Sequence, residues 1–391
     1  IIVAKFASKN PSFSQKSSKT SKSSSSKPPT SSKSSSSKAF SSSKSSSSVS
    51  KSSSSSLGFS SSSSSVANSN EIDKNVFVVE DDGTLIRTGC VQSESGCQYQ
   101  NDTVDKLKTL KKFFQEHPGS ENVYDFVMIA TTFKPGSNIG EFASTKNAIS
   151  GTGDSHKDIN LTGDRQGTGL TGNEKFQGYA FVESLDDAIS SNLRLPLHEI
   201  SHRWLFRVGD YDTCGKGFGC TKETGFKINT DGGHYNSKIN TTTKDGKNVY
   251  FSPNGGGSLQ LGSVPGYCLD HGGNSGYRFN TIDLYLMGLI PVEDAGSLKW
   301  YQTSGSWSEK GISCTEKTLT TQDIINLYGN RNPPYPNTQK DFSVAHLLLK
   351  RKDEILSSSQ IGKVNFLANQ FPKEWYKATS YKSTINGLNS F

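Results

Sequence analysis

The chain has 391 residues, a formal net charge of +7 and an apolar content of 31%. No apolar run approaches the 18 or more residues of a membrane span, so the chain as given is expected to be soluble. Residues 1–70 hold ten lysines and no acidic residue, and subtracting their +10 from +7 leaves −3 for residues 71–391. Because the excess positive charge lies wholly in that segment, without interleaved aromatic residues or a nucleic-acid motif, nucleic acid is excluded as the expected partner.

The first 70 residues are predicted to form a disordered, cationic tether. Serine dominates from Pro11 to about Ser65, with lysines at regular intervals, and such a segment cannot bury enough apolar surface to offset chain entropy. If the tether contacts anything, we expect an anionic cell-wall polymer or a membrane surface. The apolar start Ile1–Ala4, without a methionine, is consistent with a processed or a partial sequence.

Strands and one helix are predicted between residues 71 and 210. Residues 75–80 and 84–87 are expected to form a hairpin around Asp81-Asp82-Gly83, and residues 103–116 an amphipathic helix. Two buried strands are expected at residues 123–133 and 178–183.

A long polar region, residues 134–177, separates those two buried strands. It is too long for an ordinary connection, which favours a functional or ion-stabilised loop. Its oxygen-rich side chains suit calcium, although their spacing fits no EF-hand and a solvated loop is the favoured interpretation. These side chains are Asp154, His156, Asp158, Asn160 and Asp164.

The most specific pattern is His198-Glu199-Ile200-Ser201-His202, which reads H-E-x-x-H. Two imidazoles four positions apart lie on one face of a helix and can bind one zinc, while the glutamate between them reaches a water that the metal activates. The pattern therefore predicts a zinc site with Glu199 as general base. The competing interpretation is a core helix whose two histidines are satisfied by hydrogen bonds.

Apolar residues surround this pattern. Leu193–Leu197 lead into it, with proline tolerated in the first helical turn, and Trp204–Val208 follow it. Gly209-Asp210 is expected to end the helix. The segment is thus predicted to be a buried helix.

Residues 211–391 are predicted to be mostly helical. Beyond a glycine-rich stretch we expect helices at residues 281–289, 322–328 and 361–376, and a strand at residues 342–349. The whole chain is therefore assigned to the α+β class.

Six cysteines fall as three pairs of sequence neighbours, and none forms a C-x-x-C metal motif. A disulfide framework in an exported protein is therefore preferred over a thiolate metal site or free cytosolic thiols. Pairing between neighbours is the prediction, namely Cys90 with Cys97, Cys214 with Cys220 and Cys268 with Cys314.

The order of sheet, H-E-x-x-H helix and helical remainder resembles the zincin metallopeptidases. Residues 232–236 (GGHYN), 281–291 (TIDLYLMGLIP) and 339–342 (QKDF) are similar to motifs of a group of exported prokaryotic metallopeptidases. Leu205 and Val208 replace the glycine and histidine of a metzincin, and Tyr235-Asn236 replaces a Trp-Ser pair of the group. The resemblance implies a mixed sheet in a zincin-like catalytic domain, with an upper part at about 71–210 and a lower part at about 211–391.

A third protein ligand is expected downstream if zinc keeps three ligands and a water. Asp283, on a short helix, is one candidate, and an N-terminal helix charge is its alternative role. His234, flanked by glycines, is a second candidate ligand or a hydrogen-bond donor in the transition state. Tyr285 and Arg203 are candidates for stabilising an oxyanion, although helix-surface pairing explains both as well. His271 is assigned to a loop.

The sequence thus predicts a secreted or cell-surface zinc endopeptidase that hydrolyses polypeptides. The substrate is expected to lie extended beside an edge strand, for which residues 178–183 are the candidate. A non-catalytic adhesin or wall-binding module with a structural zinc is the alternative, but a structural site has no use for Glu199.

Overall fold

The computed structural model describes residues 71–93, 96–136, 140–145, 147–153, 170–205, 208, 235–240, 255–257, 259–270 and 278–386. Contacts divide the chain between Val66 and Ala67, and all described residues belong to the second unit. The predicted tether at residues 1–70 therefore lies outside the described residues. Within the described part, every helix is too short or too polar to cross a bilayer.

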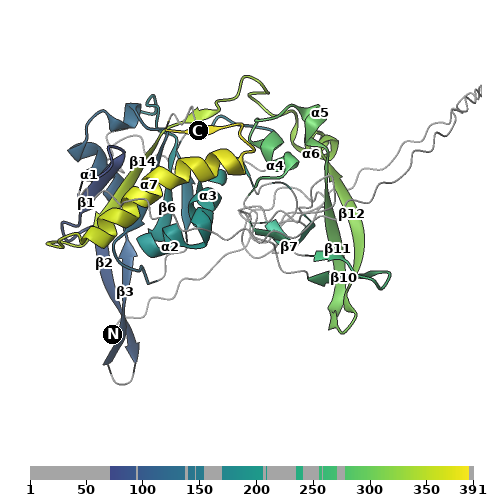
Figure 1. Cartoon of the computed structure of the whole chain (residues 1–391), viewed down its shortest axis with the longest axis horizontal. Helices are drawn as coiled ribbons and strands as arrows, with labels where there is room; N and C mark the ends of the chain where they lie inside the picture. The colour runs from purple at the N-terminus through teal and green to yellow at the C-terminus, as the bar shows by residue number, and fades with distance from the viewer. Residues whose placement is uncertain are drawn as a thin grey trace, which may run out of the picture. The chain divides into compact units, whose positions relative to one another are not determined.

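A five-stranded mixed sheet forms the first part of the fold (Figure 1). Its strand order is β1-β14-β4-β6-β5, with four parallel strands and β5 antiparallel at one edge. These strands are β1 (Val76–Glu80), β4 (Phe126–Thr131), β5 (Glu141–Ser144), β6 (Gly178–Ser184) and β14 (Val344–Lys350). The predicted mixed sheet and the α+β class are confirmed.

Helices cover both faces of this sheet. On one face lie α2 (Leu185–Ile189), α3 (Arg194–Ser201) and α7 (Ser358–Ala378), and the short 3-10 helix η2 (Ser190–Leu193) connects α2 to α3. On the other face, α1 (Lys106–Glu116) packs against the sheet, and η1 (Ser120–Asn122) follows it. The long C-terminal helix confirms the helix predicted at residues 361–376.

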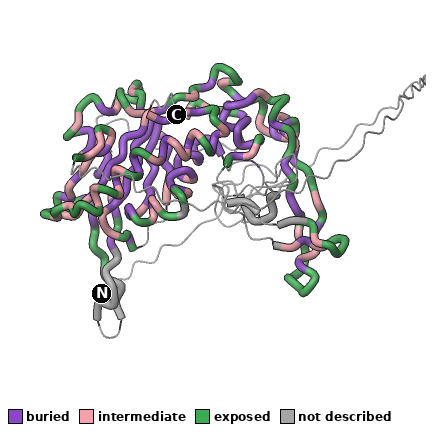
Figure 2. The backbone as a smooth tube through the Cα atoms, in the orientation of Figure 1, coloured by how far each residue is buried: buried purple, intermediate pink, exposed green. Residues whose placement is uncertain are grey.

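The alternation of side chains along the central strands creates two separate cores. In β4, Phe126 and Met128 enter the core shared with α3 and α7, whereas Val127 and Ile129 enter the core shared with α1. A strand that is buried on both faces has a continuous apolar sequence, as β4 has. Figure 2 shows the burial along the sheet. The sheet is therefore a rigid platform for the helix that carries the H-E-x-x-H pattern.

One buried carboxylate joins the starting ends of three parallel strands. Asp125, just before β4, is fully buried and accepts hydrogen bonds from Gln177, Gln339 and the backbone N–H of Ser343, each at 2.8 Å. Lys175 supplies the countercharge at 3.2 Å. Because removing one partner would leave a buried charge uncompensated, this cluster fixes the register of β4, β6 and β14.

The predicted hairpin of residues 75–80 and 84–87 is wrong. β1 pairs in parallel with β14, while β2 (Ile86–Ser93) pairs with β3 (Gly96–Val104). The Asp81 carboxylate accepts hydrogen bonds from the backbone N–H groups of Gly83 and Leu85 at 3.0 and 2.9 Å. Those N–H groups are therefore unavailable for hydrogen bonds between the two strands of a hairpin, and the chain continues into β2 without pairing with β1.

The prediction of a mostly helical remainder is also wrong. A second sheet of six strands forms in the order β8-β7-β11-β12-β10-β9. Its members are β7 (Tyr235–Asn240), β8 (Gly255–Gly257), β9 (Leu259–Leu261), β10 (Tyr267–Asp270), β11 (Ser297–Ser308) and β12 (Gly311–Thr320). Threonine and aromatic residues favour strands in β11 and β12, so local composition agrees with the hairpin.

α4 (Thr281–Leu286) and α6 (Thr321–Tyr328) confirm the helices predicted at residues 281–289 and 322–328, and β14 confirms the strand predicted at residues 342–349. The remaining elements were not predicted, and they are α5 (Val292–Ala295), β13 (Asp341–Phe342) and β15 (Thr384–Ile385). Capping boxes begin α4, α6 and α7, and a side-chain cap of this kind contributes about 1 kcal/mol to helix stability.

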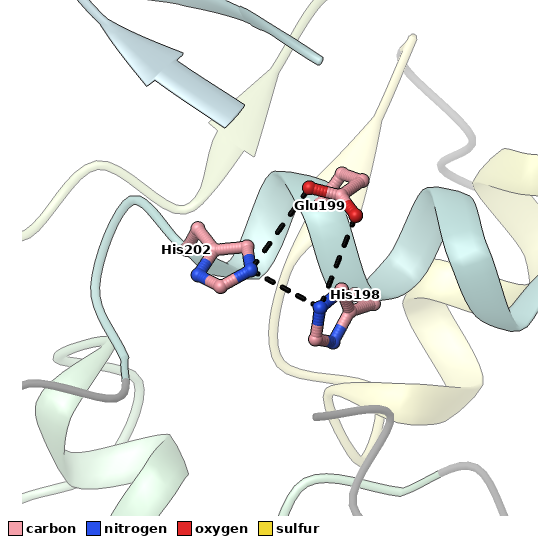
Figure 3. A group of neighbouring side chains, drawn as sticks. All are labelled: His198, Glu199 and His202. Atoms are coloured by element: carbon pink, nitrogen blue, oxygen red, sulfur yellow. Dashed lines mark hydrogen bonds and ion pairs between the residues drawn. The ribbon is translucent and has the colours of Figure 1, made fainter. Parts of the chain in front are cut away.

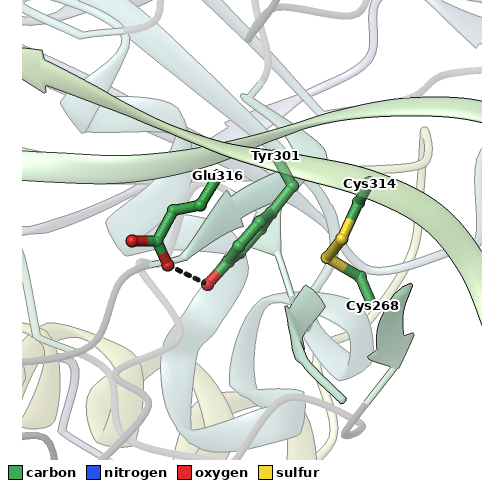
Figure 4. The surroundings of a disulfide bond; sticks show 4 residues. All are labelled: Cys268, Tyr301, Cys314 and Glu316. Carbon is green, nitrogen blue, oxygen red and sulfur yellow. Dashed lines mark hydrogen bonds between the residues drawn. A yellow bond between two sulfur atoms is a disulfide. The ribbon is translucent and has the colours of Figure 1, made fainter. Parts of the chain in front are cut away.

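A disulfide joins Cys268 of β10 to Cys314 of β12, as predicted (Figure 4). Tyr301 packs beside it, and the Tyr301 hydroxyl donates a hydrogen bond to Glu316 at 3.3 Å. The predicted pairs Cys90–Cys97 and Cys214–Cys220 rest on side chains outside the described part of the chain and stay predictions.

Candidate metal centre and active site

The H-E-x-x-H pattern spans α3 and the residue that ends it. Leu197 and Ile200 are fully buried against the sheet, which fixes the rotation of α3 about its axis. Pro196 occupies the first turn, where its missing N–H costs nothing, so the predicted start of the helix is confirmed. α3 ends at Ser201, earlier than predicted; His202 is its C-cap and turns continue to Leu205, while Gly209-Asp210 lies outside the described residues.

Three side chains from this short segment converge (Figure 3). The Nε2 atoms of His198 and His202 lie 3.1 Å apart. Glu199 places one carboxylate oxygen 3.8 Å from His198 Nε2 and the other 3.9 Å from His202 Nε2. Both imidazoles keep a small exposed fraction, 14% and 12%, so the cluster is reachable from solvent.

This donor set fits a zinc ion. Two imidazole nitrogens bound to a tetrahedral zinc are separated by about 3.3 Å, close to the separation observed here. Glu199 Oε2 is buried and has no hydrogen-bond partner among the described residues. An unsatisfied buried carboxylate oxygen is costly, so the site favours a bound group that interacts with it. Among the described residues, the cluster of potential metal ligands contains only His198, Glu199 and His202.

The surroundings of Glu199 are apolar and acidic. Burial raises the pKa of the Glu199 carboxyl well above its ordinary value, and the negative charges of Glu141 and Glu183 raise it further. The positive charge of Lys106, which forms an ion pair with Glu141, opposes this shift. An elevated pKa suits a group that must accept and then release a proton near neutral pH.

The edge strand β5 begins beside Glu199. A Cβ placed on Gly140, the residue before β5, would lie only 2.3 Å from Glu199 Oε1. β6 is flanked by β4 and β5, so the prediction that residues 178–183 form the edge is wrong. The antiparallel strand that makes the edge is only four residues long and lies within the polar region 134–177, where no alternation long enough to predict a strand exists.

Asp283 is fully buried at the start of α4. Its carboxylate accepts hydrogen bonds from the backbone N–H and the side-chain amide of Asn280, at 3.3 and 2.8 Å. The structure does not bring Asp283 into the histidine cluster. The arrangement favours the alternative role read from the sequence, a charge at the N-terminus of the helix.

Tyr285 lines a cavity, and Arg203 packs on aromatic rings. Tyr285 lines a cavity of about 610 Å³ together with Ile290, Arg331 and Tyr335, and no described residue of its lining belongs to the cluster. Burial raises the pKa of the Tyr285 hydroxyl. The Arg203 guanidinium lies over the rings of Phe126 and Trp204, at 5.7 and 5.6 Å.

Other predicted residues lie outside the described part of the chain. They are His234, His271 and the candidate calcium ligands Asp154, His156, Asp158, Asn160 and Asp164. Sequence reasoning in turn missed Gly140, Glu141 and Glu183, which the fold brings to Glu199. They are spread over more than 40 residues of chain, and no local pattern marks them.

We find no matching protein-family model, no matching curated protein and no matching solved structure for this chain. The α+β assignment therefore rests on the elements described above.

Proposed function

We propose that this protein is a zinc-dependent endopeptidase of zincin-like architecture. The observation that carries the proposal is the convergence of two imidazole nitrogens and a buried, unsatisfied carboxylate beside an antiparallel edge strand. A core helix with hydrogen-bonded histidines would not account for the buried Glu199 oxygen that has no partner among the described residues.

His198 and His202 would hold the zinc through their Nε2 atoms. When bound, zinc would lower the pKa of a water molecule and polarise the scissile carbonyl. Glu199 would accept a proton from the attacking water and deliver it to the leaving amine, and its raised pKa suits both transfers.

The polypeptide substrate would add to β5 as an extra strand. Among the described strands, β5 pairs only with β6, so its other side would be the one that accepts an extended peptide. Because Gly140, the residue before β5, lies against Glu199, a peptide paired with β5 would pass the proposed general base.

The third zinc ligand is proposed to be His234, since the Asp283 carboxylate is held in the cap of α4. A third ligand is needed because catalytic zinc sites keep three protein ligands and one open position. Asp283 remains the competing candidate, and Tyr285 and His234 remain candidates for stabilising the negative charge on the carbonyl oxygen.

A secreted or cell-surface location is proposed with this activity. The Cys268–Cys314 disulfide supports an oxidising compartment. The lysine-rich segment 1–70 would hold the enzyme on an anionic cell-wall or membrane surface. Calcium in the 154–164 region is a further, minor proposal.

The test is hydrolysis of casein by the purified full chain, with metal content measured in the same preparation. We expect about one zinc per chain, activity lost with a chelator and restored by zinc, and a loss of at least ~10² in rate for Glu199→Gln with zinc retained. A zinc-containing protein that hydrolyses no casein would instead support the adhesin alternative, and an unchanged rate in Glu199→Gln would overturn the role of Glu199 as general base.

A further inference from the structure

Gly140 lies between two carboxylates. Its backbone N–H donates a hydrogen bond to Glu183 Oε1 at 3.1 Å. On its other side, the position of an added Cβ would be 2.3 Å from Glu199 Oε1 and 2.7 Å from Leu195 Cδ1. Only glycine therefore fits between the edge strand and the general base at this point.

The backbone of Glu183 is held in an unusual conformation. Its φ of 58° lies in the left-handed region, which residues with a side chain adopt at a steric cost. The pairing of β4 with β6 shifts register there, between Ile129 and Thr131, so β6 carries an extra residue. Bulges of this kind redirect a side chain, and here the redirected side chain is the one that receives the Gly140 N–H.

We propose that Glu183 and Gly140 are positioning residues for the general base, with Glu183 clamping the Gly140 backbone against the Glu199 carboxylate. The inference rests on the proposed function and adds two residues to its machinery. Neither residue touches the substrate's reacting atoms in this role. The clamp restricts the Glu199 side chain to the orientation in which it lies near both histidines.

Fixed orientation matters because a misplacement of about 1 Å at a catalytic group can cost about 10² in rate. The left-handed backbone at Glu183 and the close approach of Gly140 to Glu199 both carry a steric cost. If the clamp served stability alone, its loss would lower the melting temperature. A positioning role instead predicts a fall in kcat at unchanged zinc content.

The first experiment substitutes the glycine. Gly140→Ala in the full chain should lower kcat by about 10² with zinc content and circular dichroism spectrum unchanged, because the methyl group displaces Glu199. Gly362→Ala is the matched control, since a Cβ there meets nothing within 4 Å, and its kcat should equal that of the wild type. An effect confined to KM would mean that the edge strand had lost its docking surface, and would overturn the positioning role.

The second experiment substitutes the glutamate and stays informative if Gly140→Ala fails to fold. Glu183→Ala should lower kcat by about 10, the equivalent of one hydrogen bond, and Glu183→Gln should restore it because the amide oxygen still accepts the N–H. Glu121→Ala is the control, since Glu121 likewise accepts a glycine N–H, from Gly119 at 3.0 Å, on the surface. Failure of Gln to restore kcat would overturn the clamp.

Hydrogen exchange gives a readout independent of activity. The Gly140 amide should be protected in zinc-free wild type and in Glu183→Gln, and should exchange rapidly in Glu183→Ala. Casein hydrolysis by the wild type and by Glu199→Gln is measured alongside the other variants. Equal hydrolysis rates for these two proteins would overturn the proposed function and this inference with it. An active wild type with normal kcat in Gly140→Ala and Glu183→Ala would overturn the clamp alone.

Discussion

Asn280 and Asp283 cap α4 reciprocally. Asn280 accepts a hydrogen bond from the Asp283 backbone N–H at 2.9 Å, and the Asp283 carboxylate accepts bonds from the Asn280 backbone and side chain. This pairing supports a capping role for Asp283, which is not among the three clustered side chains His198, Glu199 and His202.

Replacing either capping residue should therefore weaken α4 without removing zinc. We expect Asp283→Ala and Asn280→Ala each to lower the free energy of unfolding by about 1–2 kcal/mol, measured by urea denaturation, with zinc content unchanged. Loss of zinc in Asp283→Ala but not in Asn280→Ala would identify Asp283 as a ligand.

His234→Ala is expected to lose zinc. Two histidines alone leave the ion one protein ligand short, so the affinity should fall well below that of the wild type, measured by competition with a chromogenic chelator. His271→Ala provides the matched histidine control and should bind zinc normally. If His234→Ala keeps its zinc but loses turnover, then His234 acts on the carbonyl oxygen instead.

His346 should make the fold sensitive to acid. It is fully buried in β14, neither ring nitrogen has a hydrogen-bond partner among the described residues, and burial lowers its pKa to about 4. The unfolded chain binds the proton first, near pH 6.5, so this contribution to stability is complete above that pH and is lost as the pH falls toward 4. About 2 kcal/mol should be lost by pH 5.

The measurement is denaturant unfolding at a series of pH values between 4 and 7.5, for the wild type and His346→Leu. The variant should show a smaller dependence on pH across that window, because it has no imidazole to protonate. Identical pH profiles for the two proteins would show that other groups control acid stability.

Reduction of the Cys268–Cys314 disulfide should destabilise the second sheet. The bond closes 46 residues of chain, for which the chain-entropy account gives about 4 kcal/mol. Non-reducing peptide mapping should recover the linked pair, and Cys268→Ser/Cys314→Ser should unfold at lower urea concentration. A double variant as stable as wild type would mean that the sheet holds without the crosslink.

Removal of residues 1–70 should leave the melting temperature and the peptidase rate unchanged. It should weaken retention on anionic resin or vesicles at low salt, because ten lysines are lost with no acidic residue. A chain of residues 71–391 that melts several degrees lower would show that the segment packs on the domain.

The sequence by itself determined the features encoded within a few residues. The four-residue spacing of His198 and His202 places both rings on one helical face, and the apolar run at residues 126–131 forms the buried strand β4. The neighbour pairing of Cys268 with Cys314 was also predicted and is confirmed. Helix positions near residues 321–328 and 358–378 followed from local periodicity and capping.

Only the tertiary structure decided which strands pair and which residues surround Glu199. β1 pairs with β14, which is far from it in the sequence. β5 forms the edge of the sheet, although the sequence predicted that edge for β6. Gly140 and Glu183 reach Glu199 because sheet order places their strands side by side. Such contacts form only when strands and helices that are distant in the sequence pack together to bury both faces of the sheet. No local sequence pattern encodes that packing.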